Sequence, residues 1–235
     1  MPNPASAKFC WNCGKPLEAP RAHEGERKIV SVLFADVVGS TAIGEQLDPE
    51  QVTEMMNGAF ALFNAAIDRY GGTVSRLMGD AVLALFGAPI AHEDDAERAV
   101  HAGLEIQEAA QRYARMVKDT YGVDFLVRVG IHTGLAVLDK VGDDVRAEYT
   151  AMGDTANVAA RLQTAATPGT VLVSADTYRL VRPLFDAELH GAIEAKGKSV
   201  PLEAYEILRT KAVPGTVRGI EGVRSPLVGR DRELH

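Results

Sequence analysis

The sequence predicts an α+β fold, in which helices pack on a mostly antiparallel sheet and the ferredoxin-like (split βαβ) motif is the nearest template. One observation is the order of patterns along the chain: strand, helices, hairpin, long helix, strand, helix, strands. A second is the hairpin, because the predicted strands 73–78 and 81–86 are separated only by Gly79-Asp80. A third is composition, since 235 residues with 46% hydrophobic and 24% charged residues are typical of one globular domain with extensions.

The first half of this pattern contains one strand and two helices besides the hairpin. Residues 28–36 form an apolar run that is typical of a buried strand. Residues 49–69 carry apolar side chains at helical spacing, and Gly71-Gly72 ends this helix. Residues 93–118 predict a long amphipathic helix, whose acidic opening Glu93-Asp94-Asp95 suits the positive end of a helix dipole.

The second half begins with alternating apolar and polar residues over 124–138, which predict a strand that is bent or broken at Gly134. Arg128 and His132 lie on the polar side of this strand. The remaining elements are a helix at 153–166 with Asp154 as its N-cap, a strand at 170–173, a helix at 175–182, and strands at 185–194 and 201–208.

Charge and composition disfavour several classes of function. The net charge of −7 argues against a generic nucleic-acid or anionic-membrane surface, and with the few aromatic residues it argues against an RNA-binding domain. No run approaches the roughly 20 apolar residues that span a bilayer, and no apolar signal core opens the chain, so we expect a cytoplasmic protein. The two cysteines are too few for a disulfide scaffold.

Two aspartates lie at the ends of apolar runs. Asp36 closes the run 29–36, and Asp80 stands between Arg76–Gly79 and the run 81–86. A carboxylate at the end of a buried strand is costly to desolvate unless a positive group neutralises it. Mg²⁺ takes one or two carboxylates and completes its shell with water and substrate phosphates. The pair therefore suggests a shared divalent cation.

A glycine-bearing turn follows Asp36 and leads into a helix. Its backbone N–H groups are candidates to cradle a polyphosphate at the helix N-terminus. These candidates are Val37, Val38, Gly39, Ser40 and Thr41. The alternative for this region is structural: Asp36 or Ser40 caps the helix, and Asp80 is an ordinary hairpin turn residue.

A polar pair marks the helix at 153–166. Asn157 and Arg161 are four residues apart, so they share one helix face, and the surrounding alanines leave room to reach a ligand. The arginine fork matches phosphate oxygens. The alternative is an exposed helix pair without a ligand.

Four segments together resemble the catalytic domains of class III adenylyl cyclases, in the family's order and spacing over residues 27–208. They are Phe34–Thr41, Arg76–Phe86, Val129–Gly134 and Met152–Leu162. The resemblance implies the class III nucleotidyl cyclase fold and the conversion of ATP to 3′,5′-cyclic AMP and pyrophosphate. It also implies a head-to-tail homodimer with active sites at the interface.

Residue roles follow from the same resemblance. Asp36 and Asp80 would bind two Mg²⁺ or Mn²⁺ ions in each active site. From the partner chain, Asn157 would orient the ribose and Arg161 would stabilise charge at the α-phosphate. Lys196 matches a family lysine that contacts the triphosphate, with Lys198 as the second choice and an ordinary solvated turn lysine as the alternative.

The base-recognition positions depart from the common family pattern. Arg76 stands where many members carry lysine, and Thr150 stands where they carry aspartate. Threonine at this position resembles the subgroup of bicarbonate-responsive soluble cyclases, so bicarbonate is a candidate regulator. Adenine is favoured because guanylyl cyclases typically carry glutamate at the Arg76 position. The alternatives are a guanylyl cyclase of relaxed base specificity and a catalytically silent nucleotide-binding regulatory dimer.

The ends of the chain predict separate units around a catalytic domain at 27–209. Residues 1–26 contain Cys10 and Cys13, which resemble one knuckle of a zinc ribbon. Structural zinc takes four ligands, and His23 is not well spaced to add one, so we expect either a zinc site shared by two chains or a flexible segment. Residues 210–235 are linker-like and close with a segment that resembles the opening of a P-loop ATPase module. We therefore expect the front part of a longer signalling protein.

Overall fold

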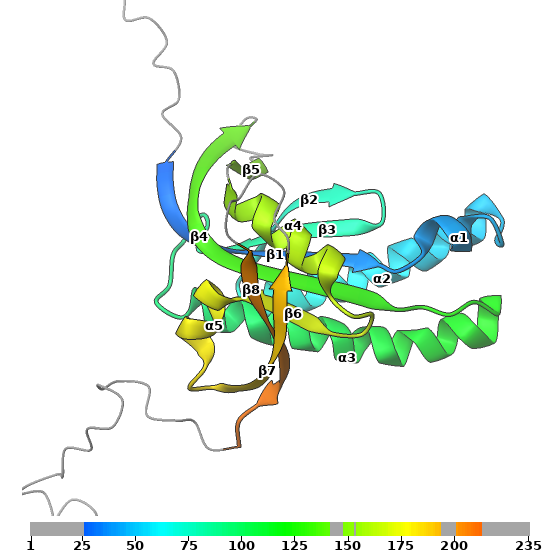
Figure 1. Ribbon diagram of the computed structural model, residues 1–235. Helices are drawn as coiled ribbons and strands as arrows, with labels where there is room; N and C mark the ends of the chain where they lie inside the picture. The colour runs from blue at the N-terminus through cyan, green and yellow to red at the C-terminus, as the bar shows by residue number, and fades with distance from the viewer. Residues whose placement is uncertain (1–25, 142–147, 153, 194–200, 213–235) are drawn as a thin grey trace, which may run out of the picture.

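The computed structural model describes residues 26–141, 148–152, 154–193 and 201–212, and Figure 1 shows their arrangement. The elements are β1 (Glu26–Val37), α1 (Ser40–Gly44), α2 (Pro49–Arg69), β2 (Thr73–Met78), β3 (Ala81–Phe86), α3 (Asp95–Tyr121), β4 (Val127–Val141), β5 (Glu148–Met152), α4 (Asp154–Ala165), β6 (Val171–Ser174), α5 (Ala175–Val181), β7 (Phe185–Ile193) and β8 (Leu202–Thr210). No described helix is both long and apolar enough to cross a membrane.

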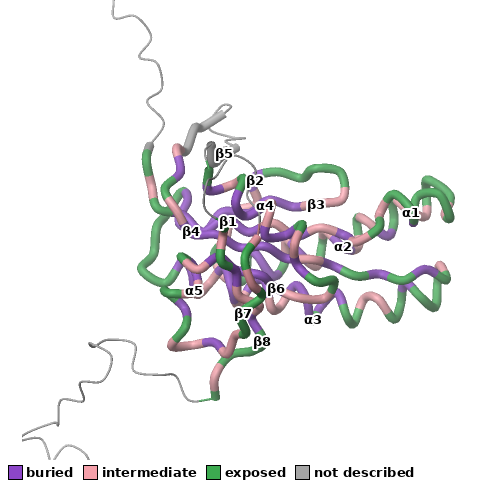
Figure 2. Tube along the Cα trace, viewed as in Figure 1, coloured by how far each residue is buried: buried purple, intermediate pink, exposed green. Residues whose placement is uncertain are grey.

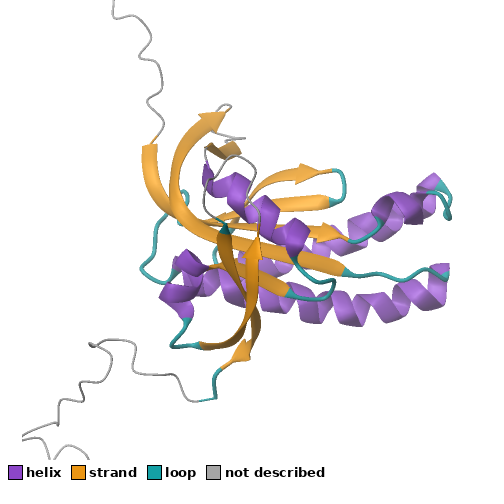
Figure 3. Ribbon diagram, in the orientation of Figure 1, coloured by secondary structure: helices purple, strands orange, loops and turns teal. Residues whose placement is uncertain are grey.

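The strands of the described residues form one sheet. Its order is β2-β3-β1-β4-β6-β8-β7, and β5 adds to β4 beside this path. The β4–β6 pair is parallel, and the other pairs are antiparallel. Figure 3 shows the helices packed against these strands. The predicted α+β fold with a mostly antiparallel sheet is confirmed.

The two faces of the sheet are covered by different helices. In β1, Leu33, Ala35 and Val37 join a core cluster with α2 and α3 residues, because alternate side chains of a strand point to one face. Val30 and Val32 belong to a second cluster that includes Ala159 of α4. Figure 2 shows the resulting buried centre along β1 and β4. Asp36 shares the alternation of Val30 and Val32, so it lies on the α4 face.

Local signals placed most elements within a few residues. Helix α2 has the predicted bounds, because Asp48 and Gln51 form a capping box and Pro49 occupies the first turn. The hairpin strands β2 and β3 also have the predicted bounds, with Gly79 at φ 66° in the turn. Helix α3 begins two residues later than predicted and ends beyond residue 118, at Tyr121.

Three local expectations were wrong or incomplete. Strand β4 continues through Gly134, which pairs with Val30, so the strand is not broken there. A Cβ at Gly134 would lie 2.9 Å from Thr155 Oγ1, so the glycine instead permits close packing of α4. Helix α4 begins at Asp154 itself, so this residue is not the N-cap. Strand β5 was not predicted.

Candidate active site

The fold brings Asp36 and Asp80 together at one end of the β1–β3 ladder. Asp36 lies opposite Ala81 in the antiparallel register, and the Val37 N–H donates to the Asp80 carbonyl at 3.2 Å. Burial raises the pKa of the Asp36 carboxyl above its usual value, and the nearby Asp80 charge raises it further, while Arg128 acts in the opposite direction. Two like charges held this close favour a shared cation.

Two donors from distant elements hold the Asp36 carboxylate. Arg128 of β4 donates from Nη2 to Oδ2 at 3.0 Å, and Gln163 of α4 donates from Nε2 to the same oxygen at 2.8 Å. Arg128 also donates from Nη1 to the Thr164 carbonyl at 3.2 Å. Asp36 is thus tied to a neighbouring strand and to the helix above it.

Sequence reasoning did not assign either donor to the site. Arg128 is recognisable as the polar side of an alternating strand, but that pattern does not identify Asp36, 92 residues away, as its partner. Gln163 lies 127 residues from Asp36, and no local pattern distinguishes it from an ordinary helix residue.

The turn after β1 supplies fewer anion donors than predicted. The Val37 and Val38 N–H groups are already bonded to the carbonyls of Asp80 and Leu126, the second at 2.8 Å. Gly39 has φ 69° and precedes α1, whose first N–H groups lack intrahelical acceptors. Ser40 does not cap α1; its hydroxyl donates to Asp80 Oδ2. The candidate phosphate donors therefore reduce to residues 39–41.

The donor set fits a hard divalent cation. It consists of two carboxylates, and no group of three or more His, Cys, Asp or Glu side chains with metal-ligand spacing occurs among the described residues. A site with only two carboxylates suits Mg²⁺ or Mn²⁺, which complete their coordination with water and substrate phosphates. Asp36 and Asp80 are the residues that would hold such an ion.

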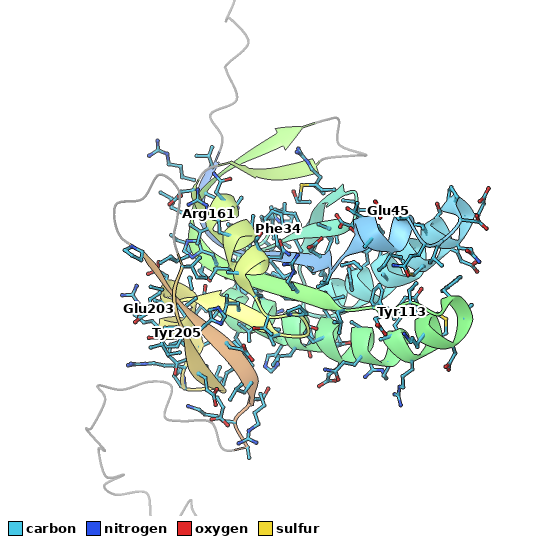
Figure 4. All side chains as sticks on the ribbon, turned by 45° about the vertical axis from the view of Figure 1, so that its right-hand side comes forward. Phe34, Glu45, Tyr113, Arg161, Glu203 and Tyr205 are labelled. Carbon is cyan, nitrogen blue, oxygen red and sulfur yellow. The ribbon has the colours of Figure 1, made fainter. Side chains whose placement is uncertain are left out.

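Asn157 and Arg161 lie on the other face of α4 from Gln163. The buried residues of α4 are Thr155, Val158, Ala159, Leu162 and Gln163. Asn157 is exposed and Arg161 is half-buried on the opposite face. In the view of Figure 4 Arg161 lies to the left of Phe34, and Glu45, which follows α1, lies to its right. Both side chains thus leave α4 on a different face from the one on which Gln163 contacts Asp36.

Comparison with known proteins decides the family. The model of the adenylate and guanylate cyclase catalytic domain matches residues 23–209. The chain belongs to this family. Class III cyclases generally use two divalent metal ions and commonly act as dimers on a nucleotide substrate.

Relatives of this cyclase domain include enzymes named for either nucleotide. Adenylate cyclase 1 of Rhizobium meliloti is 34% identical over 202 residues, which are 83% of this chain and 29% of the relative. Adenylate cyclase of Mycobacterium tuberculosis is 31% identical over 211 residues, 86% of this chain and 46% of the relative. Human guanylate cyclase soluble subunit beta-2 is 29% identical over 203 residues, 86% of this chain and 32% of the relative. The chain thus spans less than half of each relative.

Solved cyclase structures show the same fold. The adenylyl cyclase CyaB from P. aeruginosa superposes with a TM-score of 0.75 at 30% identity, over 80% of this chain and 98% of that one. The guanylyl cyclase Cya2 superposes with a TM-score of 0.73 at 30% identity, over 80% and 96%. The near equality of the two scores leaves the base to be argued from individual residues.

The remaining candidate residues of the cyclase domain are placed unequally. Arg76 is exposed on β2 and pairs with Leu83, whose side chain packs in the α4-side cluster, so Arg76 lies on the same sheet face as Asp36. Thr150 pairs with Asp139 in β5, but its side chain lies outside the described structure. The candidates Lys196, Lys198, Cys10, Cys13 and His23 also lie outside the described residues.

Proposed function

We propose that this cyclase domain is an adenylyl cyclase, which converts ATP to 3′,5′-cyclic AMP and pyrophosphate at sites shared by two copies of the chain. The observation that carries the proposal is the contact between Asp36 and Asp80 beside the start of α1. Such a site gathers carboxylates for cations and N–H groups for phosphate oxygens in one place.

The reaction is an in-line displacement at the α-phosphorus. The ribose 3′-hydroxyl releases its proton to water and its oxygen forms a bond to phosphorus. The bond from phosphorus to the bridging α,β-oxygen breaks, and pyrophosphate leaves with that oxygen. When bound by Asp36 and Asp80, the divalent cations supply stabilisation of the attacking and leaving oxygens. The protein contributes chiefly position and charge, as in other phosphoryl transfers.

The different faces of α4 support a site that is shared by two copies of the chain. Because Asn157 and Arg161 point away from their own Asp36, a second copy is the natural recipient of both side chains. Asn157 orients the ribose there, and Arg161 neutralises charge that develops on the α-phosphate. The head-to-tail arrangement gives each dimer two such sites.

Arg128 adds a role that the sequence did not suggest. Its guanidinium neutralises Asp36, and its Nε is buried without a hydrogen-bond partner among the described residues. Once cations neutralise Asp36, Arg128 has capacity for a phosphate oxygen of the nucleotide. We place it with residues 39–41 and Lys196 around the triphosphate.

Adenine selection rests on Arg76 and Thr150. The threonine hydroxyl can accept from the adenine amino group or donate to a guanine carbonyl, and arginine can donate to adenine N1 or guanine O6. The position of Arg76 on the Asp36 face of β2 supports a role beside the nucleotide. A guanylyl cyclase of relaxed specificity is therefore the second candidate.

The test is incubation of the full chain with Mn²⁺ and either ATP or GTP, with the cyclic product identified by mass. Cyclic AMP as the dominant product supports the proposal, whereas equal products from both nucleotides support the relaxed guanylyl cyclase. No product from either, together with retained nucleotide binding, supports the silent regulatory dimer. A parallel series with bicarbonate tests whether that anion raises the rate.

A further inference from the structure

Gln163 has a buried side-chain amide that donates a hydrogen bond to Asp36, the proposed cation ligand. Its residue is 8% exposed, and its Nε2 lies 2.8 Å from Asp36 Oδ2. Its Oε1 accepts weakly from the Thr164 hydroxyl at 3.5 Å, which is consistent with the amide group turned toward Asp36. A buried amide without a partner costs free energy, so this bond fixes both side chains in place.

The position of Gln163 is set by a glycine beneath it. A Cβ on Gly130 of β4 would lie 2.1 Å from the Gln163 backbone nitrogen and 2.5 Å from the Ala159 carbonyl oxygen. The backbone of α4 therefore rests directly on β4 at this point. This close approach brings the Gln163 side chain within reach of Asp36 on the next strand, β1.

The two donors on Asp36 Oδ2 differ in charge. Arg128 carries a positive charge, so it competes with a cation for Asp36. Gln163 is neutral, so it can orient the carboxylate and leave its negative charge for a cation. Outer partners of this kind commonly fix the orientation of a metal ligand.

We propose that Gln163 is a positioning residue, whose amide holds the Asp36 carboxylate of its own chain in the orientation that binds the divalent cation. The proposal deepens the proposed function, because it rests on Asp36 as a cation ligand. It assigns different tasks to the two faces of α4: Gln163 serves the Asp36 of its own chain, and Asn157 and Arg161 serve the partner's nucleotide.

The first experiment measures Mn²⁺ binding without turnover. Free Mn²⁺ is followed by electron paramagnetic resonance with the full chain, first alone and then with 3′-deoxy-ATP, which lacks the attacking hydroxyl. Gln163→Leu keeps most of the volume but cannot donate, and we expect Mn²⁺ affinity to fall by about tenfold. Saturating Mn²⁺ should then restore kcat, which a general loss of structure would not allow.

The matched control is Gln107→Leu. Gln107 of α3 is also a buried amide, and it donates to the carbonyls of Val127 and Thr170 rather than to Asp36. It should lose stability without losing Mn²⁺ affinity. Unchanged affinity in folded Gln163→Leu, or an equal loss in Gln107→Leu, would overturn the positioning role.

The second experiment places the substitution on one chain of a mixed dimer. A chain with Asp36→Ala and a chain with Arg161→Ala together retain one complete site, made from the second chain's Asp36 and the first chain's α4. Gln163→Leu should lower activity at limiting Mn²⁺ only when it is on the chain that retains Asp36. An equal loss on either chain would assign Gln163 to the seating of α4 instead.

The outcomes separate this inference from the proposed function. If the mixed dimer without any change at Gln163 is inactive, the shared site is wrong, while the Mn²⁺ measurement still tests Gln163. If the mixed dimer is active and Mn²⁺ affinity does not depend on Gln163, the shared site stands and the positioning role is wrong.

Discussion

Asp36 and Arg128 face each other across the β1–β4 ladder, with the guanidinium Nη2 3.0 Å from the carboxylate Oδ2. The arginine thus neutralises a carboxylate that the proposed mechanism assigns to a cation. We assign Arg128 two roles: it neutralises Asp36 before a cation binds, and it contacts a nucleotide phosphate afterwards. Because a charge-assisted bond of this kind opposes cation entry, a mutation should separate these two roles.

Replacement of Arg128 by glutamine removes the positive charge and keeps a polar side chain. We expect tighter Mn²⁺ binding in the absence of nucleotide, because the competing charge is gone. We also expect kcat/KM for the nucleotide to fall by about tenfold or more, because a phosphate contact is lost. Calorimetric Mn²⁺ titration and initial rates measure the two effects; a parallel change in both would contradict the assignment.

Acidic pH should weaken cation binding at this site. The pKa of Asp36 is raised by burial and by Asp80, so the folded chain holds this proton at higher pH than an ordinary carboxyl does. The proton on Asp36 adds to the free energy of unfolding of the metal-free protein. This stabilisation is complete below the usual carboxyl pKa and is lost as pH rises through the raised pKa. Stabilisation by Mn²⁺ should therefore shrink as pH falls through that raised value.

The Arg128→Gln chain provides the comparison for this pH series. Arg128 lowers the pKa of Asp36 against the other two effects, so its removal should shift the loss of Mn²⁺ stabilisation to higher pH. Thermal unfolding with and without Mn²⁺ measures the shift. The same midpoint in both chains would show that another group controls the competition.

Replacement of Asp80 by asparagine should stabilise the metal-free protein while it removes turnover. The substitution relieves like-charge repulsion with Asp36 and preserves an acceptor for the Ser40 hydroxyl. We expect a rise in Tm of about 2–4 °C, which corresponds to about 1 kcal/mol in a domain of this size. Calorimetry without metal measures this change, and a lower Tm would show that the pair is not repulsive.

Three glycine-to-alanine substitutions form a series of graded steric cost. Gly130→Ala forces a Cβ into the α4 backbone, and we expect destabilisation of about 2–4 kcal/mol. Gly134→Ala meets the side chains of Thr155 and His132 at 2.9 and 3.0 Å rather than a helix backbone, so its cost should be smaller. Gly44→Ala in α1 meets nothing within 4 Å and should be neutral or stabilising. Denaturant unfolding tests this order.

Local sequence patterns were sufficient for most of the fold. Helix α2 and the β2–β3 hairpin carry their own caps, turn glycine and periodicity, so their bounds followed directly. A break at Gly134 was the wrong alternative, because a glycine needed for close packing looks the same in the sequence as one that interrupts a strand. The short strand β5 has a mixed sequence, Glu-Tyr-Thr-Ala-Met, and depends on pairing with β4.

The candidate site was only partly accessible from the sequence. Carboxylates at strand ends pointed to Asp36 and Asp80, because burial of such charges requires an explanation. The use of the Val37 and Val38 N–H groups depends on Asp80 and Leu126, which only the folded chain brings near. The role of Gln163 could not be predicted from the sequence, because it depends on how closely α4 approaches β4.

The parallel pairing of β4 with β6 has a consequence for how this enzyme family can vary. A chain that returns in the same direction as its neighbour must be carried back over the sheet, and here α4 belongs to that crossover. The β4–β5 ladder precedes the crossover helix in the chain, so a longer ladder would leave the close contact between Gly130 and the Gln163 backbone in place. The length of this ladder can therefore vary without a change in the packing that positions Gln163.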